Sequence, residues 1–116
     1  YGLTDGDIAR MLQDSQAHAA DDMAARALGE AQVEADQLVA ITRTALASDG
    51  DLLSAPERAA IDASLAALAR CREGNDHRAL AAATEALNRA TGELAARRMN
   101  RTVARALTGR QVDTLS

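Results

Sequence analysis

The sequence is almost without aromatic side chains and has few residues that interrupt helices. Its 116 residues include one tyrosine, one proline, no phenylalanine and no tryptophan. Most of its apolar side chains are small alanines with scattered leucines, which bury little area each, so the core must be thin and the helix axes must approach closely. Ala, Leu, Arg, Glu and Gln all favour helices, whereas Val, Ile and Thr are too sparse for strands. The sequence therefore predicts an all-α fold.

Further absences exclude several classes of protein. No stretch approaches the roughly 18 continuous apolar residues of a membrane span, and no basic-then-apolar signal segment is present. The net charge of −4 and the isoelectric point near 5.1 argue against a general nucleic-acid binder. The single cysteine, Cys71, cannot form an internal disulfide, which fits a reducing cytoplasm. We expect a cytoplasmic protein with neither a nucleic acid nor a membrane as its partner.

The first residues are predicted to be a short linker that leads into a helix. Residues 1–3 are typical of a hinge, and a chain that opens in this way is expected to continue from a preceding domain. Thr4 and Asp7 have the spacing of a capping box, with the acidic side chain in the first turn, where the helix dipole favours it. The first helix, from about residue 4 to residue 15 or beyond, carries an apolar stripe made of Ile8, Met11 and Leu12.

A second, much longer helix is predicted from residue 17 to residue 48. The segment has no proline, and Gly29 is its only weak point. Its apolar stripe, at steps of three and four residues, comprises Leu28, Ala31, Ala35, Leu38, Val39, Thr42, Ala45 and Leu46. A helix of this length spans about 45 Å, which a single small core cannot cover. One end must therefore project as an arm or pack on something outside this chain.

Two short turns separate the helices that follow. Gly50 lies in a stop signal and is suited to the left-handed position after a helix. Ser54 is the expected N-cap of the next helix, with Pro56 in its first turn and Glu57 completing a capping box. Residues 73–76 end that helix and begin another. Because both turns are short, successive helices should be antiparallel neighbours.

Leucines at helical spacing mark the faces that should meet in a bundle. One stripe comprises Ile61, Leu65 and Leu68, and a seven-residue repeat comprises Leu80, Leu87 and Leu94. Val103 and Leu107 continue the apolar face, either in the same helix or in a short fifth one. We expect residues 51–109 to complete an antiparallel bundle with the back half of the long helix, and residues 110–116 to form a tail. The prediction is a long helical arm followed by this bundle, with four to five helices.

Several blocks of this sequence resemble one protein family. The opening turn at residues 2–7, residues 14–22, residues 49–58 and residues 73–76 are similar to the helical lid of the seventy-kilodalton heat-shock (DnaK-type) chaperones, without an insertion as far as about residue 95. Two further segments are similar to the bacterial branch of that family dedicated to iron–sulfur cluster assembly. They are residues 24–35 and residues 95–113.

The resemblance implies a function for the parent protein. An ATPase domain, which binds ATP and Mg²⁺, would be coupled to a β-sandwich that grips an extended peptide. The client would be a proline-containing segment of the iron–sulfur scaffold protein, and a J-domain cochaperone would stimulate hydrolysis. This chain would be the lid that closes over the gripped peptide. The resemblance places no cofactor and no metal in these residues.

The resemblance also implies site residues. It places a sandwich-docking face on the first helix, made of Ile8, Met11 and Leu12. Asp36 occupies the position of an acidic latch that pairs with a basic residue of the sandwich, and Asp22 lies on the same interface side. A second latch position holds Ala40 here, so a second polar contact is not expected. From spacing alone, Asp36 is equally well an acidic residue on a solvated face.

Other charged or reactive residues have plainer interpretations. His18 with Asp14 and Asp22 has helical spacing for a metal site, but surface charge near a helix junction is favoured. Cys71, which lies between two arginines, is expected to be a half-buried structural thiol. The arginine run from residue 97 to residue 110 lacks interleaved aromatics for base stacking, so we expect it to pair with the acidic early helices.

No catalytic arrangement stands out in these residues, and we expect no enzyme activity from them. The alternative to a chaperone lid is a free-standing helical module for dimerisation or interaction. Either interpretation leaves the first apolar stripe without a cover. We therefore expect the isolated chain to associate with itself, with the first helix docked on a neighbour or aligned with the second.

Overall fold

The described residues form four α-helices and one short 3₁₀ helix. The computed structural model describes residues 2 and 4–115, with side chains described for residues 2 and 4–109; Tyr1 and Leu3 of the predicted linker lie outside them. The elements are α1 (Asp5–Asp49), η1 (Gly50–Leu52), α2 (Ala55–Glu73), α3 (His77–Ala90) and α4 (Gly92–Leu115). Within these residues no strand occurs, so the all-α prediction is confirmed.

The first 45 helical residues form one continuous helix, α1. The Thr4 hydroxyl accepts from the Asp7 amide at 3.1 Å, and the Thr4 amide donates to the Asp7 carboxylate at 3.2 Å, as the capping box predicted. The predicted break between residues 15 and 17 is wrong. No glycine or proline occurs between Gly6 and Gly29, so the local sequence keeps the helix intact. The alternative expectation, that the first helix aligns with the second, is the arrangement found.

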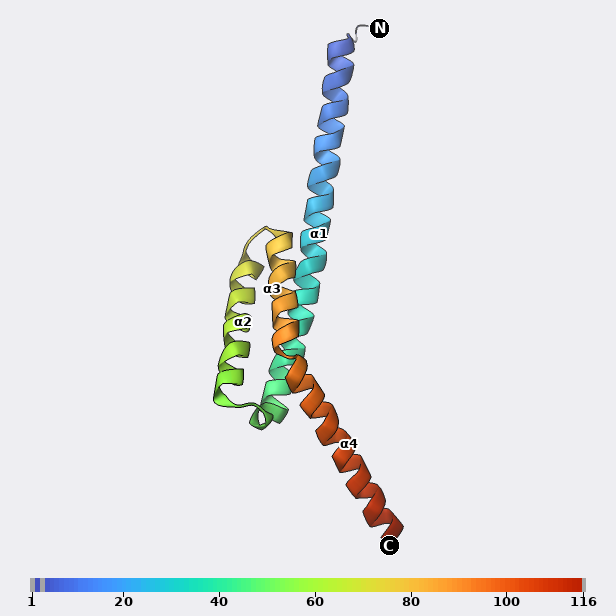
Figure 1. The fold of residues 1–116 in the computed structure, drawn as a ribbon. Helices are drawn as coiled ribbons and strands as arrows, with labels where there is room; N and C mark the ends of the chain where they lie inside the picture. Colours follow the sequence, from blue (N-terminus) through green and yellow to red (C-terminus); the bar gives the residue numbers. More distant parts are fainter. Residues whose placement is uncertain (1, 3, 116) are drawn as a thin grey trace.

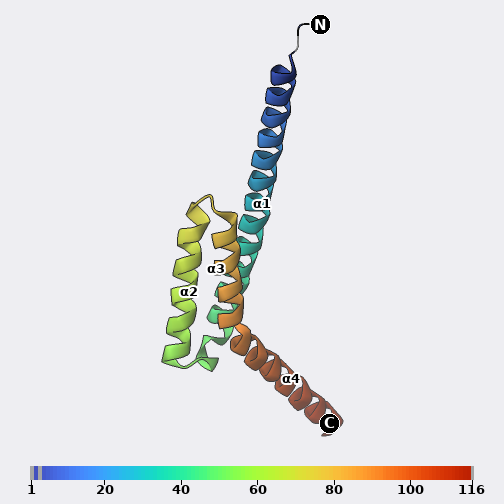
Figure 2. The same cartoon turned by 45° about the horizontal axis from the view of Figure 1, so that its top comes forward.

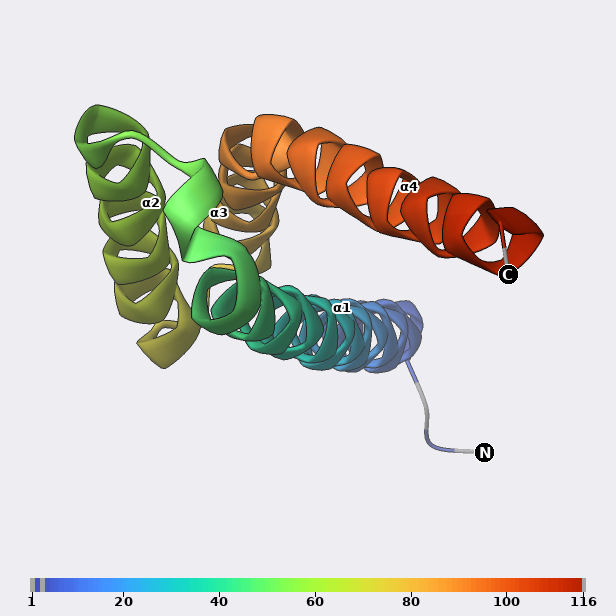
Figure 3. The same cartoon turned by 90° about the horizontal axis from the view of Figure 1, so that it is seen from below.

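The molecule is an elongated rod with a bundle at its middle. Its principal extents are 90 × 33 × 16 Å, and its radius of gyration of 23.6 Å far exceeds the value of about 13 Å expected for a compact chain of this length. The N-terminal half of α1 projects beyond the bundle in one direction, and α4 projects in the other (Figures 1 and 2). Seen from below, α4 leaves on the side away from α2 (Figure 3).

The core lies where the C-terminal half of α1 meets α2 and α3, with α3 packed against both. The predicted seam is confirmed, because Leu80, Leu87 and Leu94 are at most 1% exposed. The remaining buried apolar side chains are Ala31, Ala35, Ala45, Leu46, Ile61 and Leu68. Four of these nine residues are contributed by α1, so the predicted core of one long helix and its two successors is confirmed.

The turn between α1 and α2 follows the predicted caps but not the predicted glycine conformation. Ser54 and Glu57 form a reciprocal capping box, with Ser54 N to Glu57 Oε1 at 2.9 Å, and Pro56 lies in the first turn. Gly50 has φ −59° and ψ −23°, so it is right-handed rather than left-handed. The chain reverses through η1 instead, in which Leu53 N bonds the Gly50 carbonyl at 3.1 Å. Asp76 caps α3, as the turn at residues 73–76 implied.

The junction between α3 and α4 is a bend rather than a turn. The Thr91 hydroxyl donates to the carbonyls of Leu87 and Asn88, both at 3.0 Å, and such back-bonding bends helices. Beyond Gly92 there is one helix, which continues to Leu115. The expectation of a tail from residue 110 is therefore corrected, since α4 continues to Leu115; Ser116 lies outside the described residues.

The second half of α4 does not join the bundle. Val103 and Leu107, predicted to continue the apolar seam, are 50% and 53% exposed. Leu94 is the only buried residue of α4 among its described side chains. The expectation that residues 51–109 complete the bundle therefore holds only as far as the start of α4.

Candidate functional site

The outer side of α1 carries a line of exposed apolar side chains. At about 100° per residue, Ile8, Met11 and Val33 fall on the side of the helix opposite to the core residues Ala31 and Ala35. We call this line the outer stripe, and it comprises Ile8, Met11, Leu12, Met23 and Val33, which are between 46% and 71% exposed. The predicted docking face is its first part. Met23 and Val33 were not predicted as part of this face, although their helical spacing from Leu12 would have indicated it.

Asp36, the predicted latch residue, forms an ion pair with another residue of this chain, on the surface of the bundle. Arg72, near the end of α2, donates from Nε to Asp36 Oδ1 at 3.0 Å and from Nη2 to Oδ2 at 3.1 Å. This bidentate pair is on the surface, since the Asp36 side chain is 59% exposed. The hydrogen bond from Arg72 lowers the pKa of Asp36, and the same bond raises the pKa of Arg72.

The remaining residues that the resemblance singled out lie on α1 and are exposed. Asp22 is exposed on the projecting half of the helix, and Ala40 is exposed beside the bundle. Asp22 and Asp36 are about four helical turns apart, which places them on nearly the same side of α1. The structure does not bring them into contact with each other, because that separation is about 21 Å along the axis.

The histidine and the cysteine singled out in the sequence lie on different helices, His18 on the projecting half of α1 and Cys71 near the end of α2. Across residues 4–109, no group of three His, Cys, Asp or Glu side chains is placed to hold a metal ion, and His18, Asp14 and Asp22 are exposed. Cys71 is a free thiol of intermediate burial, as predicted.

An arginine cluster near the start of α4 forms ion pairs with the turn between α1 and α2. Arg98 donates to Asp49 Oδ2 at 2.8 Å, and Arg101 donates to Asp49 Oδ1 at 2.9 Å. Arg101 also bonds both oxygens of Asp51, at 3.0 and 2.6 Å. The bonds from Arg98 and from Arg101 lower the pKa of Asp49 and of Asp51 respectively. The prediction that this run pairs with acidic residues of the early helices is confirmed in part, because Asp49 is the last residue of α1 whereas Asp51 lies in η1.

Arg97 ties the same turn to the first turn of α2. Its Nη1 donates to the Leu52 carbonyl at 2.8 Å and to Glu57 Oε1 at 2.9 Å. Glu57 also accepts from the Ser54 amide. These hydrogen bonds lower the pKa of Glu57 to about 2, and the bond from Arg97 has the largest effect. Sequence reasoning missed this link because its two ends are far apart in the chain. Together the three arginines hold the first turns of α4 against the turn between α1 and α2.

The described part of the chain contains no helix that is both long enough and apolar enough to cross a membrane.

Comparison with known proteins identifies relatives of this chain. The model of the family described as Hsp70 protein matches residues 1–100. A protein from Azoarcus sp. named "Chaperone protein HscA homolog" is 55% identical over 113 residues, covering 97% of this chain and 18% of the relative. Proteins of the same name from Verminephrobacter eiseniae and Cupriavidus taiwanensis are each 56% identical over 115 residues, covering 99% of this chain and 18% of each relative. The chain spans about a fifth of the length of these curated relatives and matches their C-terminal region.

Proposed function

The chain belongs to the Hsp70 family, and from this premise we propose that it is the helical lid of a DnaK-type chaperone. The lid closes over a peptide held by the adjacent β-sandwich and slows its release. The observation that carries the proposal is the family match over residues 1–100 together with the outer stripe of α1. An exposed apolar line on a projecting helix is typical of a surface that has a partner.

The outer stripe supplies the docking energy in this proposal. Ile8, Met11 and Leu12 belong to the first turns of α1, and the N-terminal half of this helix projects clear of the bundle (Figure 1). A partner surface can therefore reach them without displacing any helix of this chain. Burial of apolar surface is the largest favourable term available to such a docking.

Asp36 adds orientation rather than strength. We propose that its carboxylate exchanges Arg72 for a basic side chain of the sandwich when the lid closes, with Asp22 in a supporting position. Exposed ion pairs contribute little, and this exchange replaces one such pair with another. A latch of this kind adds specificity and permits reopening, while the outer stripe holds the lid down.

The name shared by these relatives supports a more specific proposal. We propose that the parent protein is of the HscA kind and acts in iron–sulfur cluster assembly, with the scaffold protein as its client and a J-domain cochaperone as its partner. ATP and Mg²⁺ would bind in a separate ATPase domain. A cytoplasmic location follows from the same proposal.

A fusion experiment tests the proposal. The chain is joined to the β-sandwich of an HscA relative, and the release rate of a bound fluorescent peptide is measured. A lid slows release many-fold relative to the sandwich alone, and Leu12→Asp on the outer stripe removes most of the effect. Val103→Asp, on an exposed apolar residue of α4, is the matched control and leaves release slow. An equal release rate with and without the chain rejects the lid.

A second candidate function is a free-standing dimerisation module. It is favoured by the exposed outer stripe itself, which an antiparallel pair of α1 helices would bury. Sedimentation of the chain distinguishes the two, since a dimerisation module remains a tight dimer when it is fused to the sandwich.

A further inference from the structure

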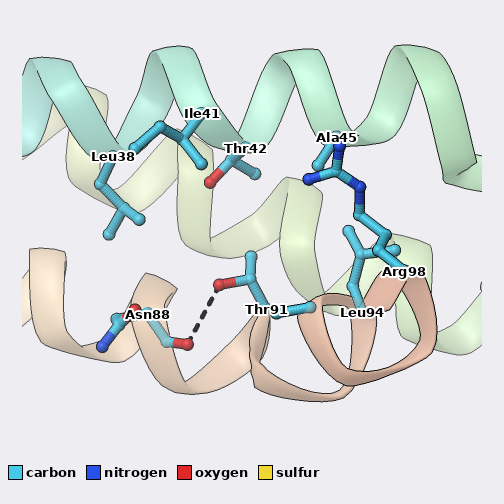
Figure 4. Close-up of a pocket in the computed structure, with 9 residues that line it drawn as sticks. Leu38, Ile41, Thr42, Ala45, Asn88, Thr91, Leu94 and Arg98 are labelled. Carbon is cyan, nitrogen blue, oxygen red and sulfur yellow. Dashed lines mark hydrogen bonds between the residues drawn. The ribbon is translucent and has the colours of Figure 1, made fainter. Parts of the chain in front are cut away.

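A small hollow lies where α1, α3 and α4 meet. Its volume is about 130 Å³, and its walls are mainly the apolar side chains Leu38, Ile41, Ala45, Leu94 and Ala95. Leu38 and Thr42 of α1 face Thr91 and Leu94 across it (Figure 4). An apolar cavity of about 150 Å³ is large enough to take a benzene-sized group, so this hollow has room for one aliphatic side chain.

One wall holds a polar atom that the fold leaves unsatisfied. Thr42 is 2% exposed, and its hydroxyl has no hydrogen-bond partner among the described residues. A threonine in a helix commonly bonds the carbonyl four residues earlier, as Thr84, Thr102 and Thr108 do here. A buried donor without a partner costs free energy. An occupant that brings an acceptor into the hollow would remove this cost.

The mouth of the hollow carries further donors. Arg98 lines it and bonds Asp49 through Nε alone, so within residues 4–109 its terminal nitrogens have no protein acceptor. Asn88, on the opposite side of the mouth, is exposed and offers both a donor and an acceptor. An apolar hollow with polar groups at its rim suits a polypeptide, whose side chain fills the hollow while its backbone bonds at the rim.

The surface around the mouth is also apolar and uncovered. Ile41 is 61% exposed on one side, and Met99 and Val103, on the projecting part of α4, are 68% and 50% exposed on the other. Ala95 and Arg98 also line a second, adjoining depression, which contains Met99 and Val103. The arginine bonds to the α1–α2 turn hold α4 in place, so the walls are formed before any occupant arrives.

From these observations we propose that the hollow is a binding site for one aliphatic side chain, of leucine or methionine size, from a partner polypeptide. The side chain lies against Leu38, Ala45 and Leu94, and the neighbouring backbone carbonyl accepts from Thr42 or from Arg98. This site lies on the bundle, away from the predicted docking face on the N-terminal half of α1. It therefore stands apart from the proposed lid contact and does not depend on it.

A methyl-NMR titration of the chain tests the proposal. The probe is N-acetyl-leucine amide, which is uncharged and carries both the side chain and the flanking carbonyls. We expect saturable shifts of the methyl signals of Leu38, Ile41, Thr42 and Leu94, and no such shifts with N-acetyl-glycine amide. Equal responses to the two probes, or no response to either, overturn the assignment.

Two variants of α4 sharpen the test. Ala95→Leu fills the mouth from an exposed position and should weaken binding of the leucine probe by about tenfold or more. Ala96→Leu makes the same change one residue away, outside the hollow, and should leave binding unchanged. Unchanged binding in Ala95→Leu overturns the site. Shifts of the same methyl groups with protein concentration alone identify a second copy as the occupant and also overturn it.

Discussion

The carboxylate of Asp36 and the guanidinium of Arg72 face each other in two parallel hydrogen bonds of 3.0 and 3.1 Å, which join α1 to the end of α2. The pair satisfies both oxygens of a residue that the family resemblance reserves for a partner outside this chain. In the proposed lid, Arg72 therefore competes with that partner.

This competition predicts the effect of removing Arg72. In the fusion with a β-sandwich, Arg72→Gln frees Asp36 and should slow peptide release by about two- to five-fold, which is the range for an exposed ion pair. Asp36→Asn should have the opposite effect. Arg70→Gln, two residues earlier on α2 and outside the ion pairs of the described residues, is the control. Faster release with Arg72→Gln would show that Arg72 supports the closed lid.

Glu57 predicts how stability depends on pH. Its pKa is about 2 in the folded chain against an ordinary value of 4.5. Its contribution is therefore fully present above pH 4.5 and is lost as the pH falls toward 2. Glu57→Gln keeps the capping geometry but removes the charge. The variant should be less stable than the parent at pH 7, and this difference in melting temperature should shrink as the pH falls.

Asp62→Asn is the control for the acid titration, because Asp62 makes only an i,i+4 pair with Arg58 on the surface of α2. It should leave the pH profile nearly unchanged. A difference between Glu57→Gln and the parent that stays constant down to pH 2 contradicts the prediction.

The direction of α4 should depend on its ion pairs. Little apolar burial holds this helix beyond Leu94, so Arg98 and Arg101 carry much of its orientation. Spin labels at Ala69→Cys and Ala104→Cys, in a Cys71→Ser background, report the distance between α2 and α4. Arg101→Gln should broaden the distance distribution, and high salt should do the same in the parent. Arg10→Gln, on the projecting half of α1 and far from the α1–α2 turn, is the control.

Core and surface leucines should differ sharply in their contributions to stability. Leu80 is fully buried, so Leu80→Ala should lower the free energy of unfolding by about 2–5 kcal/mol. Leu107 is 53% exposed on α4, and Leu107→Ala should change stability by less than about 0.5 kcal/mol. Urea denaturation measures both. Similar losses for the two variants would mean that α4 packs on the bundle in solution.

Gly29 should be a site of easy stabilisation. A Cβ atom built there meets no atom within 4 Å, so Gly29→Ala gains helix propensity without a clash. We expect an increase of about 0.5–1 kcal/mol in helix stability, seen as greater hydrogen-exchange protection of the amides around residue 29. A loss of protection would indicate that the glycine is needed for a bend.

The local signals in the sequence were sufficient for the bundle. The capping boxes at Thr4 and Ser54 depend on residues only three positions apart, and the repeat of Leu80 and Leu87 is the period of one helix face. Such features are fixed by short-range geometry, which a sequence displays directly. The break predicted in α1 had no such signal, because residues 7–28 contain neither a glycine nor a proline.

The ion pairs could not be found in the same way. Asp36 and Arg72 meet because α1 and α2 run antiparallel from the turn near Gly50, so their contact depends on the register of two helices. Arg98 reaches Asp49 only because the chain bends at Thr91. These relationships join residues that are tens of positions apart, and no periodicity within one helix encodes them.

The projecting half of α1 is held only by its own ladder of backbone hydrogen bonds, whereas the other half is anchored in the bundle. Such a helix grows outward from its anchored end, so its amides should exchange with solvent fastest near Asp5 and progressively more slowly toward Leu28. Interrupting it adds one new helix nucleus, with a nucleation constant on the order of 10⁻³, or about 4 kcal/mol. A binding surface that buries a few apolar side chains can outweigh that penalty. The same polypeptide can therefore have a continuous α1 when it is unbound and an interrupted α1 when the projecting half lies against a partner surface.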